Sequence, residues 1–218
     1  MAEVVFVSLN YGTLKTQILE DAHRPGLTAK VDDFVRQAEG VIFRRLRSAE
    51  LITRVDLTDS DRVTASEGFY TLPSDYLEER SLFIASAAGD VQLESVSLAE
   101  LRRYSGSAPV RHYSIISQSE IEFRGIPSTT DTIELIYFAR PTAFSSDSDT
   151  NAILTNHESI YIHAALAVLY QYTQDLELSQ VHAGFAAEAI EGLNEQSGRV
   201  LGGARTAGYY DFSSWDAR

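Results

Sequence analysis

The chain has 218 residues, a formal net charge of -13 and no cysteine. This length favours one compact domain with room for an inserted lobe, and an apolar fraction of 44% is enough for a packed core. The absence of cysteine excludes disulfides, thiolate metal sites and cysteine nucleophiles, and the negative charge disfavours binding to a phosphate backbone. The sequence shows neither an apolar run of membrane-spanning length nor a basic leader, so we expect a soluble protein made in the cytoplasm.

Two helices are predicted near the N-terminus. A short apolar edge covers residues 13–22, and a stronger pattern covers residues 28–49, where apolar side chains recur on one helical face. Thr28 follows a Pro-Gly turn and is the expected N-cap of the second helix. The last turns of that helix carry three cations, Arg44, Arg45 and Arg47. We expect the two helices to form a hairpin, with these cations complementing the negative end of the helix dipole.

An antiparallel sheet is predicted after these helices. Beyond Glu50 the apolar period changes from about 3.6 to about 2, and turn residues separate short runs rich in β-branched side chains. The predicted strands are 62–72, 81–85, 91–93, 113–116, 121–124 and 132–139. Ser97 and Glu100 have the spacing of a helical capping box, so one short helix should interrupt the strands. Strands this short are typical of an inserted β lobe rather than of a parallel α/β core.

Two more helices are predicted in the last third of the chain. Residues 159–172 are apolar on nearly every side, so this helix must be buried, and Thr155 with Glu158 has capping-box spacing before it. Asp175 should cap a second long helix, which is expected to end at Gly198. The expected inward stripe of that helix is Leu178, Val181, Phe185, Ala189 and Leu193.

The same region is strongly acidic. Between Pro141 and Gly198 there is no Lys or Arg, although the whole chain has 18 such residues. Three of its carboxylates, those of Glu188, Glu191 and Glu195, lie on the predicted long helix. The segment 141–151 is rich in Ser, Asp and Thr, which favours a solvated loop.

The C-terminal residues are rich in aromatic side chains. The segment after residue 198 contains several glycines, which favour flexibility, yet the chain ends with Tyr209, Tyr210, Phe212 and its only tryptophan, Trp215. With 11 Tyr, 10 Phe and 1 Trp in the chain, a uniform spread would place about one aromatic residue in any ten. Rings on a flexible tail cannot bury one another, so they indicate a contact with a partner. The alternative is that the tail folds back on its own domain.

Patterns typical of an enzyme or a metal site are missing from the sequence. There is no Gly-rich turn followed by Lys and Ser or Thr, and no Gly-x-Ser-x-Gly elbow for a nucleophilic serine. His157 and His163 stand six residues apart on a predicted helix, so their side chains diverge by about 240°, unlike a zinc-binding pair. We therefore predict a non-enzymatic protein that needs no cofactor and no metal.

Four segments are informative in their order along the chain. They are Phe34–Glu39 running into Ile42–Arg47, then Leu72–Glu78, Ile136–Pro141 and Asn151–Leu154. With a β lobe between an N-terminal and a C-terminal helical hairpin, most of the chain resembles the head-to-tail adaptor family of short-tailed and related phages, also called neck or tail accessory proteins. The apolar start at Val4–Val7 matches this family less well.

The resemblance implies an α+β fold with a helical core of two hairpins. It implies a single adaptor domain over 1–200 with an inserted antiparallel β region at about 51–140, and an extended arm over 201–218. Family members are structural subunits of the virion neck that form a ring, here expected to have twelve copies, and they need no cofactor. Their partners are the portal protein, a tail or nozzle protein and further copies of the same chain. In such rings the C-terminal segment grips the portal, which is the expected role of Tyr209, Tyr210, Phe212 and Trp215.

Two further roles follow from a ring with a central channel. Arg44, Arg45 and Arg47 are expected to pair with carboxylates of a neighbouring subunit, and dipole compensation on a free surface is the alternative. The side chains expected to line the channel are Glu188, Glu191 and Glu195. Phosphates would be repelled there and DNA would pass without specific binding, whereas solubility alone is the alternative.

Two other functions stay open at this point. The first is a tail-completion or stopper ring protein, which sits further from the portal. The second is a cytoplasmic binding module unrelated to phages. A membrane partner is not expected.

Overall fold

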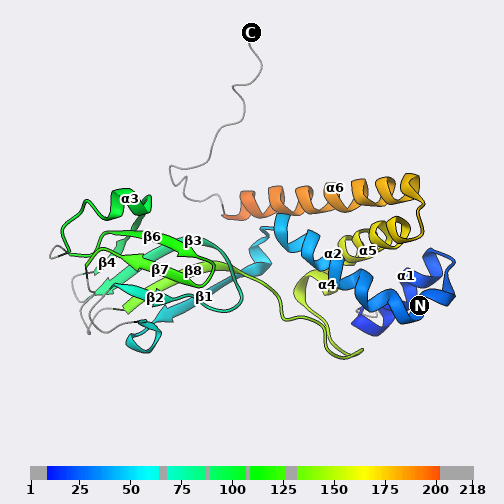
Figure 1. Ribbon diagram of the computed structural model, residues 1–218, viewed down its shortest axis with the longest axis horizontal. Helices are drawn as coiled ribbons and strands as arrows, with labels where there is room; N and C mark the ends of the chain where they lie inside the picture. The colour runs from blue at the N-terminus through cyan, green and yellow to red at the C-terminus, as the bar shows by residue number, and fades with distance from the viewer. Residues whose placement is uncertain (1–8, 64–67, 87–88, 107–108, 126–131, 202–218) are drawn as a thin grey trace, which may run out of the picture. The chain divides into compact units, whose positions relative to one another are not determined.

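The computed structural model describes residues 9–63, 68–86, 89–106, 109–125 and 132–201 (Figure 1). The fold is α+β, as the sequence predicts. The described chain divides into two compact units. Residues 9–13 and 50–156 form the β unit, and residues 14–49 and 157–201 form the helical unit.

The described part of the β unit contains strands in two sheets. The strands are β1 Ile52–Leu57, β2 Phe69–Thr71, β3 Tyr76–Ser86, β4 Gly89–Gln92, β5 Glu94–Ser95, β6 His112–Ser117, β7 Glu120–Phe123 and β8 Thr132–Ala139. The first sheet has the order β1-β8-β3-β4 and the second the order β2-β7-β6-β5. Neighbouring strands pair antiparallel, except that β5 and β6 are parallel.

Strand β8 carries the central part of the β core. It pairs with β3 so that Leu82 lies opposite Leu135. Along β8, Ile133, Leu135 and Tyr137 are buried and alternate with more exposed residues, which is the period of a strand with one inward side. These side chains share one hydrophobic core with residues of the second sheet, among them Ile121. The two sheets therefore bury a common apolar layer.

Each predicted strand segment contains a strand in the structure, although the bounds differ. Two further strands were not predicted. Strand β1 reads Ile-Thr-Arg-Val-Asp-Leu, and its charged residues hide the alternation because Arg54 finds its counter-charge on β8, with its Nη2 2.9 Å from Glu134 Oε2. Strand β5 has two residues and is too short to leave a pattern. The predicted strand 62–72 is shorter in the structure, where β2 keeps a single bridge from Tyr70 to Arg62.

The loop 141–151 is mostly exposed, as predicted, and Asp149 organises it. Its carboxylate accepts hydrogen bonds from the Ser146 hydroxyl at 2.6 Å and the Ser145 backbone N–H at 2.7 Å, and these hydrogen bonds lower the pKa of Asp149. The first turn of helix α1 docks here, because the Gly12 N–H donates to the Asp147 carbonyl at 2.9 Å. A Cβ at Gly12 would lie 2.9 Å from Asp147 Cβ, so this close approach requires glycine.

The helical unit is built around a buried central helix. Its elements are α1 Tyr11–Asp21, which begins in the β unit, the 3-10 turn η1 Pro25–Lys30, α2 Val31–Arg45, α5 Glu158–Tyr172 and α6 Leu176–Leu201. Helix α5 packs against both α2 and α6 (Figure 1). Its Ile160, Tyr161, Leu166 and Leu169 are all buried, which confirms the prediction from its all-round apolar sequence.

Four further short elements lie in the described residues. They are η2 Ala49–Leu51, η3 Asp59–Asp61, α3 Leu98–Leu101 and α4 Ala152–Asn156. Two predicted caps are confirmed. The Ser97 hydroxyl accepts the Glu100 N–H at 3.2 Å and starts α3, and the Asp175 carboxylate accepts the Leu178 N–H at 3.3 Å and starts α6.

Four predicted helix boundaries are wrong. The helix predicted over residues 28–49 ends at Arg45, so Arg47 lies beyond α2. Thr28 does not cap α2, because it lies inside η1 and its hydroxyl donates to the Pro25 carbonyl at 2.8 Å. Thr155 does not cap α5, because it belongs to α4 and α5 begins only at Glu158. Gly198 does not end α6, which continues to Leu201. An isolated glycine costs a helix about 1 kcal/mol, and the packing of α6 upstream of Gly198 outweighs this cost.

Candidate assembly surfaces

Helix α6 buries a stripe that differs in part from the predicted one. The buried residues are Ala186, Ile190, Leu193 and Ser197. Of the predicted stripe, Leu193 is buried and Ala189 half-buried, but Leu178, Val181 and Phe185 are 38%, 45% and 49% exposed. The prediction was therefore wrong for the N-terminal half of this helix. We call Leu178, Val181 and Phe185 the apolar flank.

Polar side chains explain the rotated stripe. Where the apolar pattern placed Leu178 and Val181 inside, the helix instead turns Ser179 and His182 toward α5. The Ser179 hydroxyl donates to the Ala167 carbonyl at 2.8 Å. Because their polar groups are hydrogen-bonded, small or polar residues can lie in the contact between α5 and α6. A prediction from hydrophobic periodicity alone does not detect such residues.

A pair of histidines lies in this contact between α5 and α6. The Nδ1 atoms of His163 and His182 are 3.2 Å apart, so one ring donates and the other accepts. The His182 ring stacks on Tyr170, and the His163 ring lies 5.2 Å from Phe185. Burial lowers the pKa of His182, and the nearby His163 lowers it further. The sequence analysis missed this pair because the two residues come from different helices.

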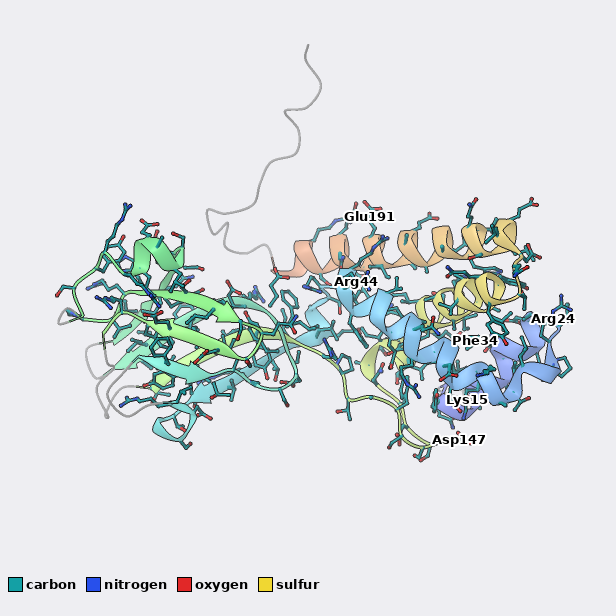
Figure 2. The ribbon with its side chains drawn as sticks, in the orientation of Figure 1. Lys15, Arg24, Phe34, Arg44, Asp147 and Glu191 are labelled. Carbon is teal, nitrogen blue, oxygen red and sulfur yellow. The ribbon has the colours of Figure 1, made fainter. Side chains whose placement is uncertain are left out.

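Three carboxylates form a ridge on the outer side of α6. Glu188, Glu191 and Glu195 are exposed, and at about 100° per residue they lie on the side opposite the buried stripe. Figure 2 shows Glu191 on the outer edge of α6, directed away from α5. Glu195 Oε2 lies 3.6 Å from Arg199 Nη2 in an exposed pair, which contributes little stability. We call these three residues the acidic ridge.

The three arginines at the end of α2 have two different environments. Arg44 and Arg45 are exposed and form no ion pair within the described part of the chain. Figure 2 shows the position of Arg44. The Arg47 guanidinium instead donates to the carbonyls of Phe43 at 3.0 Å and Leu46 at 2.8 Å. Arg47 thus donates to carbonyl groups at the end of α2 that have no backbone donor. The guanidinium groups of Arg44 and Arg45 remain available for contacts with a partner.

Helix α6 holds the end of α2 through Asn194. The Asn194 side chain accepts the Arg47 backbone N–H at 2.7 Å and donates to the Arg45 carbonyl at 2.9 Å. Three residues on, the buried Ser197 hydroxyl accepts the Ala49 N–H at 2.9 Å. These bonds fix the basic end of α2 against the C-terminal half of α6. The exposed arginines and the acidic ridge are therefore held in a fixed position relative to each other.

A family model for the SU10 adaptor protein matches residues 9–208. The chain belongs to this adaptor family. This finding confirms the resemblance to phage adaptors that the order of segments indicates. A solved structure described as the neck of an empty GTA particle is similar over 79% of this chain and 82% of that chain, with 16% identity and a TM-score of 0.29. No curated protein matches this chain.

Other kinds of site are not evident in the described residues of this adaptor. Among them no three His, Cys, Asp or Glu side chains gather to hold a metal ion. In the same ranges, no helix combines the length and the hydropathy that a membrane span requires. The aromatic residues Tyr209, Tyr210, Phe212 and Trp215 lie outside the described residues, so their portal-binding role stays a prediction.

Proposed function

We propose that this adaptor joins the portal to the tail of a phage-like particle as one subunit of a closed ring in the neck. The observation that carries the proposal is the acidic ridge on α6, together with membership of the adaptor family. A ring subunit needs one surface toward its neighbours, one toward the channel and one toward the portal. The described residues offer a candidate for each of the first two.

The channel side is assigned to the acidic ridge. From Pro141 to Gly198 the chain has no Lys or Arg, so this hairpin carries no local cation for the ridge other than Arg199. Carboxylates repel phosphates within a Debye length of about 8 Å in physiological salt. A wall of Glu188, Glu191 and Glu195, repeated around the ring, would let DNA pass without sticking.

The neighbour side is assigned to Arg44 and Arg45. Exposed guanidinium groups pair bidentately with carboxylates and are weakly hydrated, which suits an interface between subunits. Arg47 is left out of this role because its side chain already bonds to Phe43 and Leu46.

The portal side is assigned to the terminal aromatic residues Tyr209, Tyr210, Phe212 and Trp215. Aromatic anchors contribute most of the binding energy in many interfaces. A portal pull-down tests this role. The full chain should bind the purified portal, and a chain cut after Gly203, which keeps all of α6, should lose binding.

The same pull-down separates an adaptor from a stopper ring. A stopper sits further from the head and need not bind the portal, so equal behaviour of the full and the cut chain would contradict the adaptor role. A matched control is a full-length chain in which the four aromatic residues are Ser. If this control binds as the wild type does, the rings are not the anchors.

A further inference from the structure

The apolar flank of α6 is a surface that the subunit leaves about half exposed. Leu178, Val181 and Phe185 line one side of the helix, between the buried stripe and the acidic ridge. Leu176, at the start of α6, is also exposed by 61%. Single exposed apolar residues are ordinary, but a row of them along one helix side marks a contact with a partner.

This flank is preformed. The ring of Phe185 packs 5.2 Å from His163 and 6.2 Å from His182, and the Asp175 cap fixes the start of the helix. A partner that binds here therefore has little side-chain freedom to immobilise, which favours association.

Charge narrows the choice of partner. Glu177 and Glu188 are exposed on α6 beside the flank, and the hairpin of α5 and α6 has no Lys or Arg before Arg199. A matching surface must combine an apolar contact with cations around it, because an acidic rim repels an acidic partner.

The outer side of helix α2 has this combination. Val41 is 43% exposed on the outer side of the helix, and Arg44, one turn further on, lies about 60° from it, whereas Arg36 lies about 140° from Val41. The Arg36 side chain is 74% exposed, although one of its nitrogens pairs with Asp33 at 3.3 Å. At Gly40 an added Cβ would meet no atom within 4 Å, so a second helix can come close to the backbone here.

We propose that the apolar flank of α6 seats the outer side of α2 from the next copy of this chain. This inference rests on the proposed ring and names the surfaces that close it. The two surfaces are different parts of the same chain, as a head-to-tail ring contact requires. Val41 packs against Phe185, and Arg44 pairs with Glu188 of the neighbouring copy, at the edge of the acidic ridge, which leaves Glu191 and Glu195 toward the channel.

The positions of these residues along the axes of α2 and α6 agree with this pairing to within about one turn. The Asn194 bonds put residues 45–47 of α2 level with residue 194 of α6, and both helices run toward the same end of the unit (Figure 1). Counting back at about 1.5 Å per residue places Val41 level with Ala189 and Arg44 level with Gly192, so Val41 and Phe185, like Arg44 and Glu188, are offset by the same four residues, about one turn. In a ring whose axis follows these helices, a neighbouring copy keeps the same levels.

Cross-linking of single-cysteine chains tests the contact. The protein has no cysteine, so each introduced thiol is unique. Gln37 is exposed one turn before Val41 on the same side of α2 and lies opposite Val181 at the same four-residue offset. Gln37→Cys and Val181→Cys chains are mixed, assembled on the purified portal and treated with a short bismaleimide. The proposal expects a cross-linked dimer on a denaturing gel, and each chain alone should give none.

A matched control uses Gln180→Cys in place of Val181→Cys. Gln180 is also exposed, but it points about 100° away, on the opposite flank of α6. If the Gln37 and Gln180 thiols cross-link as well as the Gln37 and Val181 thiols, the proposed seat is wrong. If the wild-type chain adds no ring to the portal at all in electron micrographs, the proposed function fails and the inference with it.

Charge reversal gives a second test on full-length chains. Arg44→Glu should raise the concentration needed for ring assembly about tenfold, because it places a carboxylate beside Glu188. Adding Glu188→Arg to the same chain should restore most of that loss. Restoration by Glu191→Arg, which lies on the other side of the ridge, to the same extent would overturn the assignment.

Discussion

The β unit and the helical unit differ in how their exposed apolar residues are arranged. In the β unit the buried large apolar residues form one core, and exposed ones such as Val63 and Ile116 are scattered over separate segments. In the helical unit α6 exposes the apolar flank as a row beside the acidic ridge, and Arg44 and Arg45 form no ion pair among the described residues. A row of exposed apolar residues is a better partner surface than scattered ones. We infer that subunit assembly depends mainly on the helical unit.

The largest expected effect is a loss of stability from the β core. Leu135 is fully buried in the middle of β8, so Leu135→Ala should lower the free energy of unfolding by about 2–5 kcal/mol through a cavity and lost burial. Urea unfolding of the purified chain measures this. A loss below about 1 kcal/mol would contradict the assignment of this residue to a packed core.

A smaller loss is expected where α6 holds the end of α2. Asn194→Ala removes two hydrogen bonds, to the Arg47 N–H and the Arg45 carbonyl, and should cost about 1–3 kcal/mol. Gln196→Ala, on an exposed position of the same helix, is the control and should stay within about 0.5 kcal/mol. If the two variants unfold at the same urea concentration, Asn194 has no locking role.

A substitution in the apolar flank should weaken ring assembly more than it lowers the stability of the free subunit. Val181→Ser should change the free energy of unfolding of the free subunit by less than about 1 kcal/mol, since Val181 is 45% exposed. The same change should weaken ring assembly on the portal markedly, as judged by sedimentation. Equal assembly of Val181→Ser and wild type would remove the main difference between the two units.

The smallest effect concerns pH. Burial lowers the pKa of His182, so the unfolded chain binds protons more readily than the folded one. Stability should therefore be fully present above the ordinary histidine pKa of about 6.5 and should fall as pH drops below it. Urea unfolding of wild type and His182→Gln at pH 7.5 and pH 5.5 measures the difference. A wild type that gains stability relative to the variant on acidification would contradict this direction.

Strong apolar patterns predicted the architecture well. Tyr161 and its neighbours on α5 are buried as the all-round apolar sequence indicates, and the alternation in β8 gave a true strand. Short or charged strands were not predicted. Strand β5 has too few residues to show a pattern, and Arg54 in β1 forms its ion pair with a residue of another strand, β8.

The surfaces were harder to predict than the core. Phe185 was expected inside, because periodicity assigns every apolar residue to the buried side and cannot recognise His182 as part of a helix contact. Arg44, Arg45 and Arg47 look alike in sequence, and only their hydrogen bonds separate the capping Arg47 from the two exposed cations.

The most direct test of the ring is an electron cryomicroscopy reconstruction of the adaptor assembled on its portal. The account predicts a closed ring in which α6 lines the channel, with Glu191 and Glu195 toward the axis, Glu188 beside Arg44 of the next subunit, and Phe185 against Val41 of the next subunit. A reconstruction with the acidic ridge on the outer wall, or with Phe185 facing solvent, would contradict it.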